Sequence, residues 1–317
     1  MKKIIFPLLC CLSLASCAKT ETVFEGNFQS LFDTNVNVRI YQGSEENIKE
    51  LKGILSTFSK ETDNYLETDV PGVYTLNQSN NPVTVSSNLY KCLQKGDEIS
   101  KSLDSYFSIC LGSLSKLWKE KLPNETIPTT DEINSELLKF QNTSVTFSEN
   151  NQVTRNGESE IDLGGIAKGY AIDMCANYFK EKQITQYIVD TTSSILLGEK
   201  PSEDGNYIIK IKALQNSFIK AKNICVSTSS IEHQLYVVDG KRYSHIISPE
   251  TGQASFINDT CIVLSESGTL GDALATSMML MSLPEVISME EEFNVKAIII
   301  RDSKVIYQNE DINIFHG

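Results

Sequence analysis

The sequence predicts an α+β fold, built as a single large domain of mixed sheets and helices. Short segments in which apolar and polar residues alternate, typical of strands, are interspersed with segments whose apolar residues recur at helical spacing. Several neighbouring strands are joined by short, turn-like segments, which favours hairpins over the strand–helix–strand units of a parallel sheet. No repeat period or heptad run divides the 317 residues.

The N-terminus is predicted to be an export leader. Lys2 and Lys3 precede an apolar run over 4–14 that is too short to cross a bilayer as a mature helix. The following Leu-Ala-Ser-Cys sequence resembles a bacterial lipobox, which implies cleavage before Cys17 and lipidation of its thiol. The alternative is an ordinary signal peptide with a chance cysteine.

This leader divides the chain into three parts. Residues 1–16 are expected to be a lipoprotein signal peptide, and the polar, small residues 17–30 a lipidated tether. Residues 31–315 are expected to form the folded domain, long enough for one large domain or two fused halves.

Composition narrows the possible partners. The formal net charge is −13, so neither nucleic acid nor anionic lipid is an expected partner, and membrane attachment would come from the acyl chains. The cysteines show no CxxC spacing and there are three histidines, which leaves little for a zinc site. A bound metal is expected to be a hard ion held by oxygen atoms.

The first half of the chain is expected to contain strands and helices in mixed order. Apolar spacing predicts helices over 45–63 and 87–103, with strands over 35–41 and 82–86. Pro71 to Pro82 is expected to be a loop. An Asn-rich turn between two short strands within 137–162 is a hairpin signal.

The second half repeats this mixture. A helix is expected from about Tyr170 to 182. Further strands are expected near 186–190, 207–212, 233–238, 260–265, 296–300 and 304–308, and helices over 271–282 and 284–291.

The stretch from Ile161 to Tyr170, IDLGGIAKGY, predicts a strand that ends at Asp162-Leu163 and runs into a helix. Amide groups at a helix N-terminus bind phosphate well, and glycines at 164 and 165 would let a ligand approach the main chain. Lys168 could add a full positive charge. Paired glycines at such a turn are also common where elements pack tightly, so this pattern alone does not distinguish a ligand site from tight packing.

Three other stretches carry possible chemistry. If Gly271 begins a helix, Asp272 and Thr276 share one face and could hold Mg²⁺ through oxygen atoms. The alternative is an aspartate that complements the helix dipole and a threonine bonded back to a carbonyl. His245 follows the hairpin turn Asp239-Gly240 and could act as a general base, or be structural.

The aromatic residues of 104–118 form the last of these stretches. Tyr106, Phe107 and Trp118 could line a pocket for a flat ring, or belong to an ordinary core.

Read in order, IDLGGIAKGYAID, YSHIISPETG and GDALATS resemble the ApbE family of flavin transferases. The resemblance extends from FDTNVNVRIY at 32–41 to AIIIRDSKVIY at 297–307. It implies an ApbE-like, T-fold-related architecture. It also implies an activity that uses FAD as substrate and Mg²⁺ as cofactor to attach FMN to a threonine of an exported protein.

The resemblance also implies the site residues. The metal ligands would be Asp272, Thr276 and the carbonyl of Gly165, and His245 occupies the position of the catalytic histidine. The flavin pocket would be formed by Phe32, Phe58, Tyr106, Phe107, Ser108, Asp162, Lys168 and Ile246.

The chain departs from the family pattern at several pocket positions. Ser108 and Cys110 stand where an aspartate and a threonine are usual, and Thr192-Ser193-Ser194 replaces a glycine-rich turn. Ser230, His233 and Gln234 replace Gly, Glu and Arg, and Ser248 replaces an aspartate three residues after the histidine. A serine cannot carry the charge that would stabilise an imidazolium.

We therefore expect a Mg²⁺-dependent FAD:protein FMN transferase that is extracytoplasmic and lipid-anchored to a bacterial membrane. Its partners would be FAD, an exported acceptor flavoprotein and the membrane, through the N-terminal lipid. Two alternatives remain open: an FAD pyrophosphatase that releases FMN and AMP, and a non-catalytic FAD-binding lipoprotein.

Overall fold

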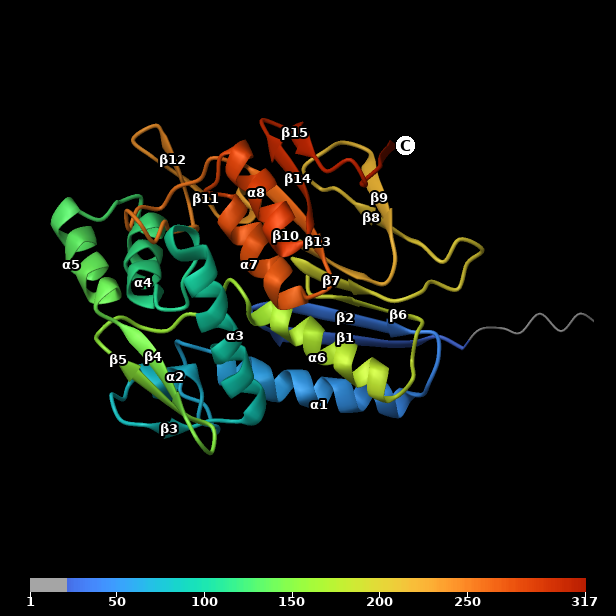
Figure 1. The fold of residues 1–317 in the computed structure, drawn as a ribbon, viewed down its shortest axis with the longest axis horizontal. Helices are drawn as coiled ribbons and strands as arrows, with labels where there is room; N and C mark the ends of the chain where they lie inside the picture. The colour runs from blue at the N-terminus through green and yellow to red at the C-terminus, as the bar shows by residue number, and fades with distance from the viewer. Residues whose placement is uncertain (1–21) are drawn as a thin grey trace, which may run out of the picture.

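A computed structural model describes residues 22–317 and is centred on an eight-stranded antiparallel sheet (Figure 1). The strand order is β1-β2-β6-β7-β10-β13-β14-β15, and every neighbouring pair is antiparallel. The bounds are β1 Phe24–Leu31, β2 Thr34–Ile40, β6 Tyr187–Asp190, β7 Ser194–Leu197, β10 Ile224–Ser230, β13 Thr260–Ser265, β14 Lys296–Arg301 and β15 Lys304–Gln308. The prediction of an α+β fold is confirmed.

Three helices cover one face of this sheet: α1 (Glu45–Thr62), α6 (Ala167–Glu181) and α7 (Gly268–Met278). Their apolar sides and the inward strand residues form the larger hydrophobic core. Helices α6 and α7 pack very closely, since a Cβ atom on Gly169 would lie 2.3 Å from the carbonyl oxygen of Gly268. The third glycine of the 161–170 motif is therefore required by helix packing.

The opposite face of the sheet is covered by a second, three-stranded sheet. It consists of β8 (Tyr207–Lys210), β9 (Ser217–Ala221) and β16 (Ile314–His316). The two faces explain why all six residues of β13 are buried. Cys261 and Val263 belong to the core under the helices, whereas Ile262 and Leu264 belong to the core under the second sheet.

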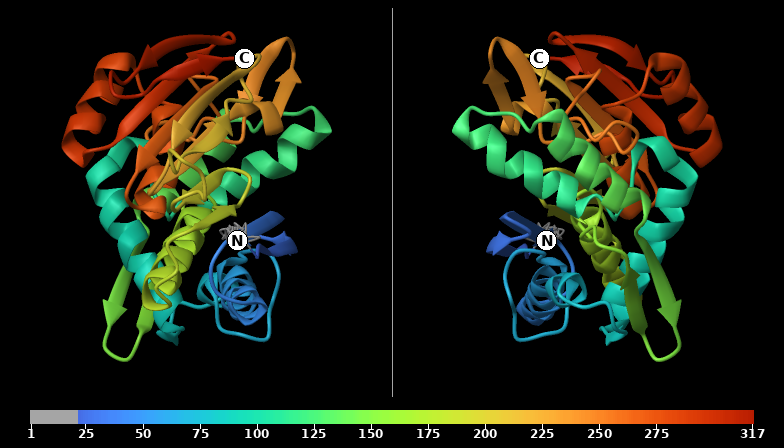
Figure 2. Two further views of the ribbon diagram at one scale, coloured as in Figure 1. Left: turned by 90° about the vertical axis from the view of Figure 1, so that its right-hand side faces the viewer. Right: turned by 90° about the vertical axis from the view of Figure 1, so that its left-hand side faces the viewer.

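The remaining elements surround the helical side. The helices are α2 Val73–Asn77, α3 Ser87–Leu103, α4 Gly112–Lys121, α5 Thr130–Gln141 and α8 Leu283–Phe293, with 3₁₀ turns at Asp104–Tyr106, Leu122–Asn124 and Ile231–His233. The strands are β3 Val83–Thr84, β4 Ser144–Ser148, β5 Gln152–Asn156, β11 Leu235–Val238 and β12 Lys241–Ser244. Figure 2 shows the β4–β5 hairpin projecting at the opposite end of the molecule from the C-terminus.

Several expectations from the sequence are wrong in detail. The expected loop at 71–82 contains α2, which is too short to show a helical period. Helices α4 and α5 were not expected, although Thr129 and Glu132 form a capping box at the start of α5 that could have revealed it.

The expected tether is also partly wrong. Strand β1 begins at Phe24 and pairs with β2, so most of 17–30 that the structure describes belongs to the sheet. The signal peptide and Cys17 lie outside the described residues. Within 22–317, no helix combines the length and apolar character that a membrane crossing needs.

Candidate active site

A pocket of about 450 Å³ opens among the loops at one edge of the helical layer. It brings together ten of the twelve predicted site residues: Phe32, Tyr106, Phe107, Ser108, Asp162, Gly165, Lys168, His245, Ile246 and Thr276. The other two, Phe58 and Asp272, lie behind this lining. Segments from nearly the whole length of the chain therefore meet at one place.

Phe32 enters the pocket from a strained turn. Phe32 and Asp33 connect β1 to β2 with φ angles of +52° and +57°, in the left-handed region where Asn-Gly is the usual pair. The Phe32 ring packs 5.9 Å from the ring of Phe58, which is buried and supports it from behind. A bulky residue kept in this conformation suggests that the turn is retained for the position of its side chain.

The diglycine segment is a turn that leads into α6, since the Ala167 amide donates to the carbonyl oxygen of Leu163 at 2.8 Å. The strand expected to end at Asp162-Leu163 is absent. The Asp162 amide donates to the carbonyl oxygen of Ile109 at 2.8 Å, and the Gly164 amide donates to Oδ1 of Asp162 at 2.8 Å. A Cβ atom on Gly165 would lie 2.9 Å from the ring of Phe107. Gly165 thus allows a pocket-lining ring to lie against the main chain.

Asp272 lies in the middle of α7 and Thr276 in its last turn, because this helix begins at Gly268 and not at Gly271. Oδ2 of Asp272 accepts a hydrogen bond from the Gly169 amide at 2.9 Å, and the side chain is only 3% exposed. Burial raises the pKa of Asp272, and the nearby Lys168 opposes this shift. The Thr276 hydroxyl donates to the carbonyl oxygen of Asp272 at 3.0 Å, as the structural alternative expected.

These oxygen atoms fit a hard cation in chemical type. Gly165 and Thr276 line the pocket, and a cation would relieve the cost of burying the Asp272 carboxylate. Within residues 22–317, no three His, Cys, Asp or Glu side chains gather as a metal-binding group. A cation at this place would therefore depend on hydroxyl and carbonyl oxygens beside one carboxylate.

His245 lines the pocket at the end of β12, where the hairpin leads into a turn. The Ser248 amide donates to the Gln253 carbonyl at 2.9 Å, and the Gly252 amide donates to the Ser248 carbonyl at 2.8 Å. The Ser248 hydroxyl accepts from the Thr251 amide at 3.3 Å. Ser248 therefore supports the turn that follows the histidine.

A sequence model of the ApbE family matches residues 32–299, which include every residue of the pocket lining except Ser30. The chain belongs to the ApbE family.

Proteins named FAD:protein FMN transferase are similar over most of the chain. The Chlamydia pneumoniae protein is 26% identical over 293 residues, covering 86% of this chain and 89% of its own length. The Escherichia coli protein is 24% identical over 251 residues, covering 73% of this chain and 67% of its own.

Solved ApbE structures share the fold. The Thermotoga maritima ApbE protein superposes with a TM-score of 0.78 at 23% identity, covering 91% of this chain and 97% of that one. The Vibrio cholerae flavin transferase ApbE gives a TM-score of 0.74 at 22% identity, covering 93% and 97%.

The ApbE pattern of a glycine-rich turn is replaced here by a threonine in a glycine-like conformation. Thr192 lines the pocket with a φ of +76°, which is rare for a β-branched residue. Its hydroxyl lies 2.8 Å from the hydroxyl of Thr34, and its amide donates to Oδ1 of Asp190 at 2.7 Å. The main chain thus keeps a glycine-like shape at this position and bears some strain.

Other expectations about the lining need correction or addition. Trp118 does not line the pocket: it is buried in a separate core and donates to the carbonyl oxygen of Gly252 at 2.8 Å. Lys119 and Tyr65 do line the pocket but were not predicted, because α4 was not expected and the loop after α1 showed no pattern.

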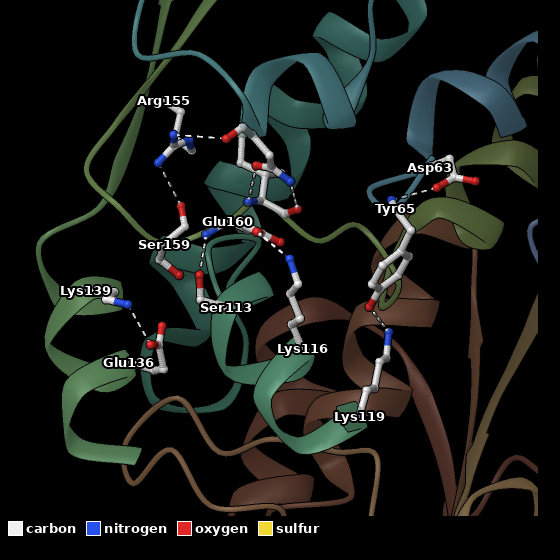
Figure 3. A network of polar contacts seen from close by, with 12 residues as sticks. Asp63, Tyr65, Ser113, Lys116, Lys119, Glu136, Lys139, Arg155, Ser159 and Glu160 are labelled. Atoms are coloured by element: carbon white, nitrogen blue, oxygen red, sulfur yellow. Dashed lines mark hydrogen bonds and ion pairs between the residues drawn. The ribbon is translucent and has the colours of Figure 1, made fainter. Parts of the chain in front are cut away.

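A polar network holds the pocket loop against α4 (Figure 3). Arg155 is buried and donates to carbonyl oxygens that include those of Ser159, at 3.3 Å, and Asn77, at 3.2 Å. The Glu160 amide donates to the Ser113 hydroxyl at 3.0 Å, and the Glu160 carboxylate pairs with Lys116 at 3.2 Å. The segment before Asp162 is therefore fixed by bonds on both of its sides.

Proposed function

We propose that this protein is a FAD:protein FMN transferase that moves FMN from FAD to a threonine of an exported acceptor protein and releases AMP. The observation that carries this proposal is the pocket itself. It combines aromatic rings, the diglycine loop with Lys168, and His245, which are the groups needed to hold a flavin, a diphosphate and a nucleophile.

The proposed reaction is a displacement at phosphorus. The acceptor threonine oxygen forms a bond to the phosphorus of the FMN half, and the bond from that phosphorus to the bridging oxygen of the diphosphate breaks. The threonine proton passes to His245, and AMP leaves with the bridging oxygen. Lys168, in the first turn of α6, stabilises negative charge on the phosphate oxygens.

Mg²⁺ is proposed as the cofactor, held by Asp272, Thr276 and the carbonyl oxygen of Gly165. When bound it would neutralise charge on the diphosphate. The support is the oxygen character of these groups and the burial of Asp272 beside Lys168. The Thr276 hydroxyl could keep donating to the Asp272 carbonyl oxygen, because it would hold the cation through an oxygen lone pair.

The proposed location is the outer side of a bacterial membrane, with the anchor at a lipidated Cys17. Because β1 begins at Phe24, six residues would separate the anchor from the sheet. At about 3.5 Å per extended residue they would span roughly 20 Å. The domain would then act close to the membrane surface, on acceptors held there.

The test is incubation of the full chain with FAD, Mg²⁺ and threonine-containing acceptor peptides, followed by mass spectrometry and AMP analysis. A covalent FMN adduct with an equal amount of AMP supports the proposal, and both should disappear with EDTA. Free FMN and AMP without an adduct would identify an FAD pyrophosphatase instead.

A second candidate is a lipoprotein that binds FAD without transferring FMN. The turn after His245 favours it, because Ser248 bonds to the Thr251 amide and offers no charge to the histidine. In that case FAD would stay intact on the protein with Mg²⁺ and every acceptor peptide.

A further inference from the structure

Lys119 and Tyr65 meet in the pocket through a contact that the proposed reaction does not use (Figure 3). The Lys119 ammonium donates to the Tyr65 hydroxyl at 2.7 Å and lies 4.9 Å from the centroid of the Tyr65 ring. Lys119 comes from α4, and Tyr65 from the loop that follows α1. The contact therefore joins two separate walls of the pocket.

The charge of Lys119 is only loosely neutralised. Its ion-pair partner is Asp162, with 4.0 Å between Nζ and Oδ2, at the outer limit of an ion pair. Burial lowers the pKa of Lys119, but Asp162, Tyr65 and Asp33 together raise it by more, so the ammonium stays charged at neutral pH. An anionic ligand could compete with the distant carboxylate for this ammonium.

Lys119 also lies beside the diglycine loop. Asp162, which pairs with Lys119, accepts the hydrogen bond of the Gly164 amide. The Asp162 carboxylate therefore lies between the Lys119 ammonium and the main chain of the diglycine loop. The diphosphate is proposed to bind along this main chain. Lys168 approaches the same loop from α6, and its charge acts on Asp272.

We propose that Lys119, held in place by Tyr65, binds a phosphate oxygen of the flavin nucleotide. This inference rests on the proposed function and adds a substrate-binding residue to it. An ammonium group is a compact donor that suits a phosphate oxygen. Tyr65 acts as a positioning residue, because its hydroxyl and ring limit the rotamers of the long lysine side chain.

The experiment measures the affinity of the full chain for FAD and for riboflavin, which lacks phosphate, by flavin fluorescence in EDTA. Lys119→Met should weaken FAD binding about fivefold and leave riboflavin binding unchanged, because it removes one partly exposed charge-assisted bond. Tyr65→Phe should weaken FAD binding about twofold. Lys119→Arg should retain most of the affinity for FAD.

Lys121→Met is the matched control. Lys121 is on the same helix and pairs with Glu132 of α5, but it does not line the pocket, so its loss should leave both affinities unchanged. An equal loss of FAD and riboflavin binding in Lys119→Met, or no loss of either, would overturn the inference and leave the proposed function standing. A wild-type chain that binds neither flavin would overturn both.

Discussion

Replacing Asp272 by asparagine separates the proposed metal-binding role from the structural role of this residue. Asp272 is 3% exposed and accepts a hydrogen bond from the Gly169 amide where α6 meets α7. Asparagine keeps an oxygen for that bond but removes the charge that a cation would need. Alanine would remove both and leave the amide buried without its partner, at a cost of about 1–3 kcal/mol.

Without Mg²⁺, Asp272→Asn should be at least as stable as the wild type at neutral pH. Burial raises the pKa of Asp272, so the ionised carboxylate is less favourable in the folded protein than in the unfolded chain. A neutral amide avoids this cost. Because the packing of α6 against α7 buries Asp272, its substitution acts inside the protein and not at an exposed position.

With Mg²⁺ the order should reverse. At a concentration one hundred times its Kd, a ligand that binds only the folded state stabilises it by about 2.7 kcal/mol. With an unfolding entropy of about 2.1 cal/mol/K per residue, a chain of this size would gain about 4 °C in Tm. Differential scanning fluorimetry with and without Mg²⁺ should show this increase for the wild type and little or none for Asp272→Asn.

Asp173→Asn provides the control. Asp173 caps the start of α7 by accepting from the amides of Gly268 and Thr269, so its substitution should lower Tm but keep the response to Mg²⁺. An Asp272→Asn variant with the full wild-type increase would show that the cation, if one binds, is held elsewhere.

Four further predictions concern the pocket and its pH dependence. Ser248→Asp should raise the single-turnover rate of FMN transfer with little change in FAD affinity, because a carboxylate could orient a protonated His245; an unchanged or lower rate would contradict this role. The double variant Phe32→Asn, Asp33→Gly should raise the free energy of unfolding by about 1 kcal/mol in urea titration, yet weaken flavin binding. Thr192→Gly should leave the free energy of unfolding in urea titration unchanged or raise it by up to about 1 kcal/mol. A clearly lower free energy of unfolding would show that the positive φ of Thr192 carries no strain. Without metal, the free energy of unfolding of the wild type relative to Asp272→Asn should be greatest below pH 3.8, the pKa of Asp272 in the unfolded chain. It should decline as pH rises through the raised pKa of the folded protein. A difference that does not change with pH would contradict the raised pKa.

Much of the fold could be predicted from local patterns. Apolar spacing placed the helices at 45–63 and 87–103 within one residue of α1 and α3, because each forms an amphipathic side that its own residues define. The hairpin turn at Asp239-Gly240 likewise placed His245 at the end of β12. Short elements such as α2 were missed because five residues hold too little of a period to recognise.

The site was predicted in its parts but not in its arrangement. The four-residue spacing of Asp272 and Thr276 determined that they share a helix face, because that relation depends on the helix alone. Whether Asp272 is buried depended on how α6 packs against α7 through Gly169.

Residue spacing predicted most of the longer helices and strands, and the ordered motifs predicted membership of the ApbE family. Long-range packing alone places Lys119 in the pocket and its neighbour Trp118 outside it, and lets Phe32 reach the pocket through a strained turn. Neighbours within a helix or strand follow from residue spacing. Contacts between segments depend on how apolar surfaces far apart in the sequence pack together, and no local sequence pattern specifies that packing.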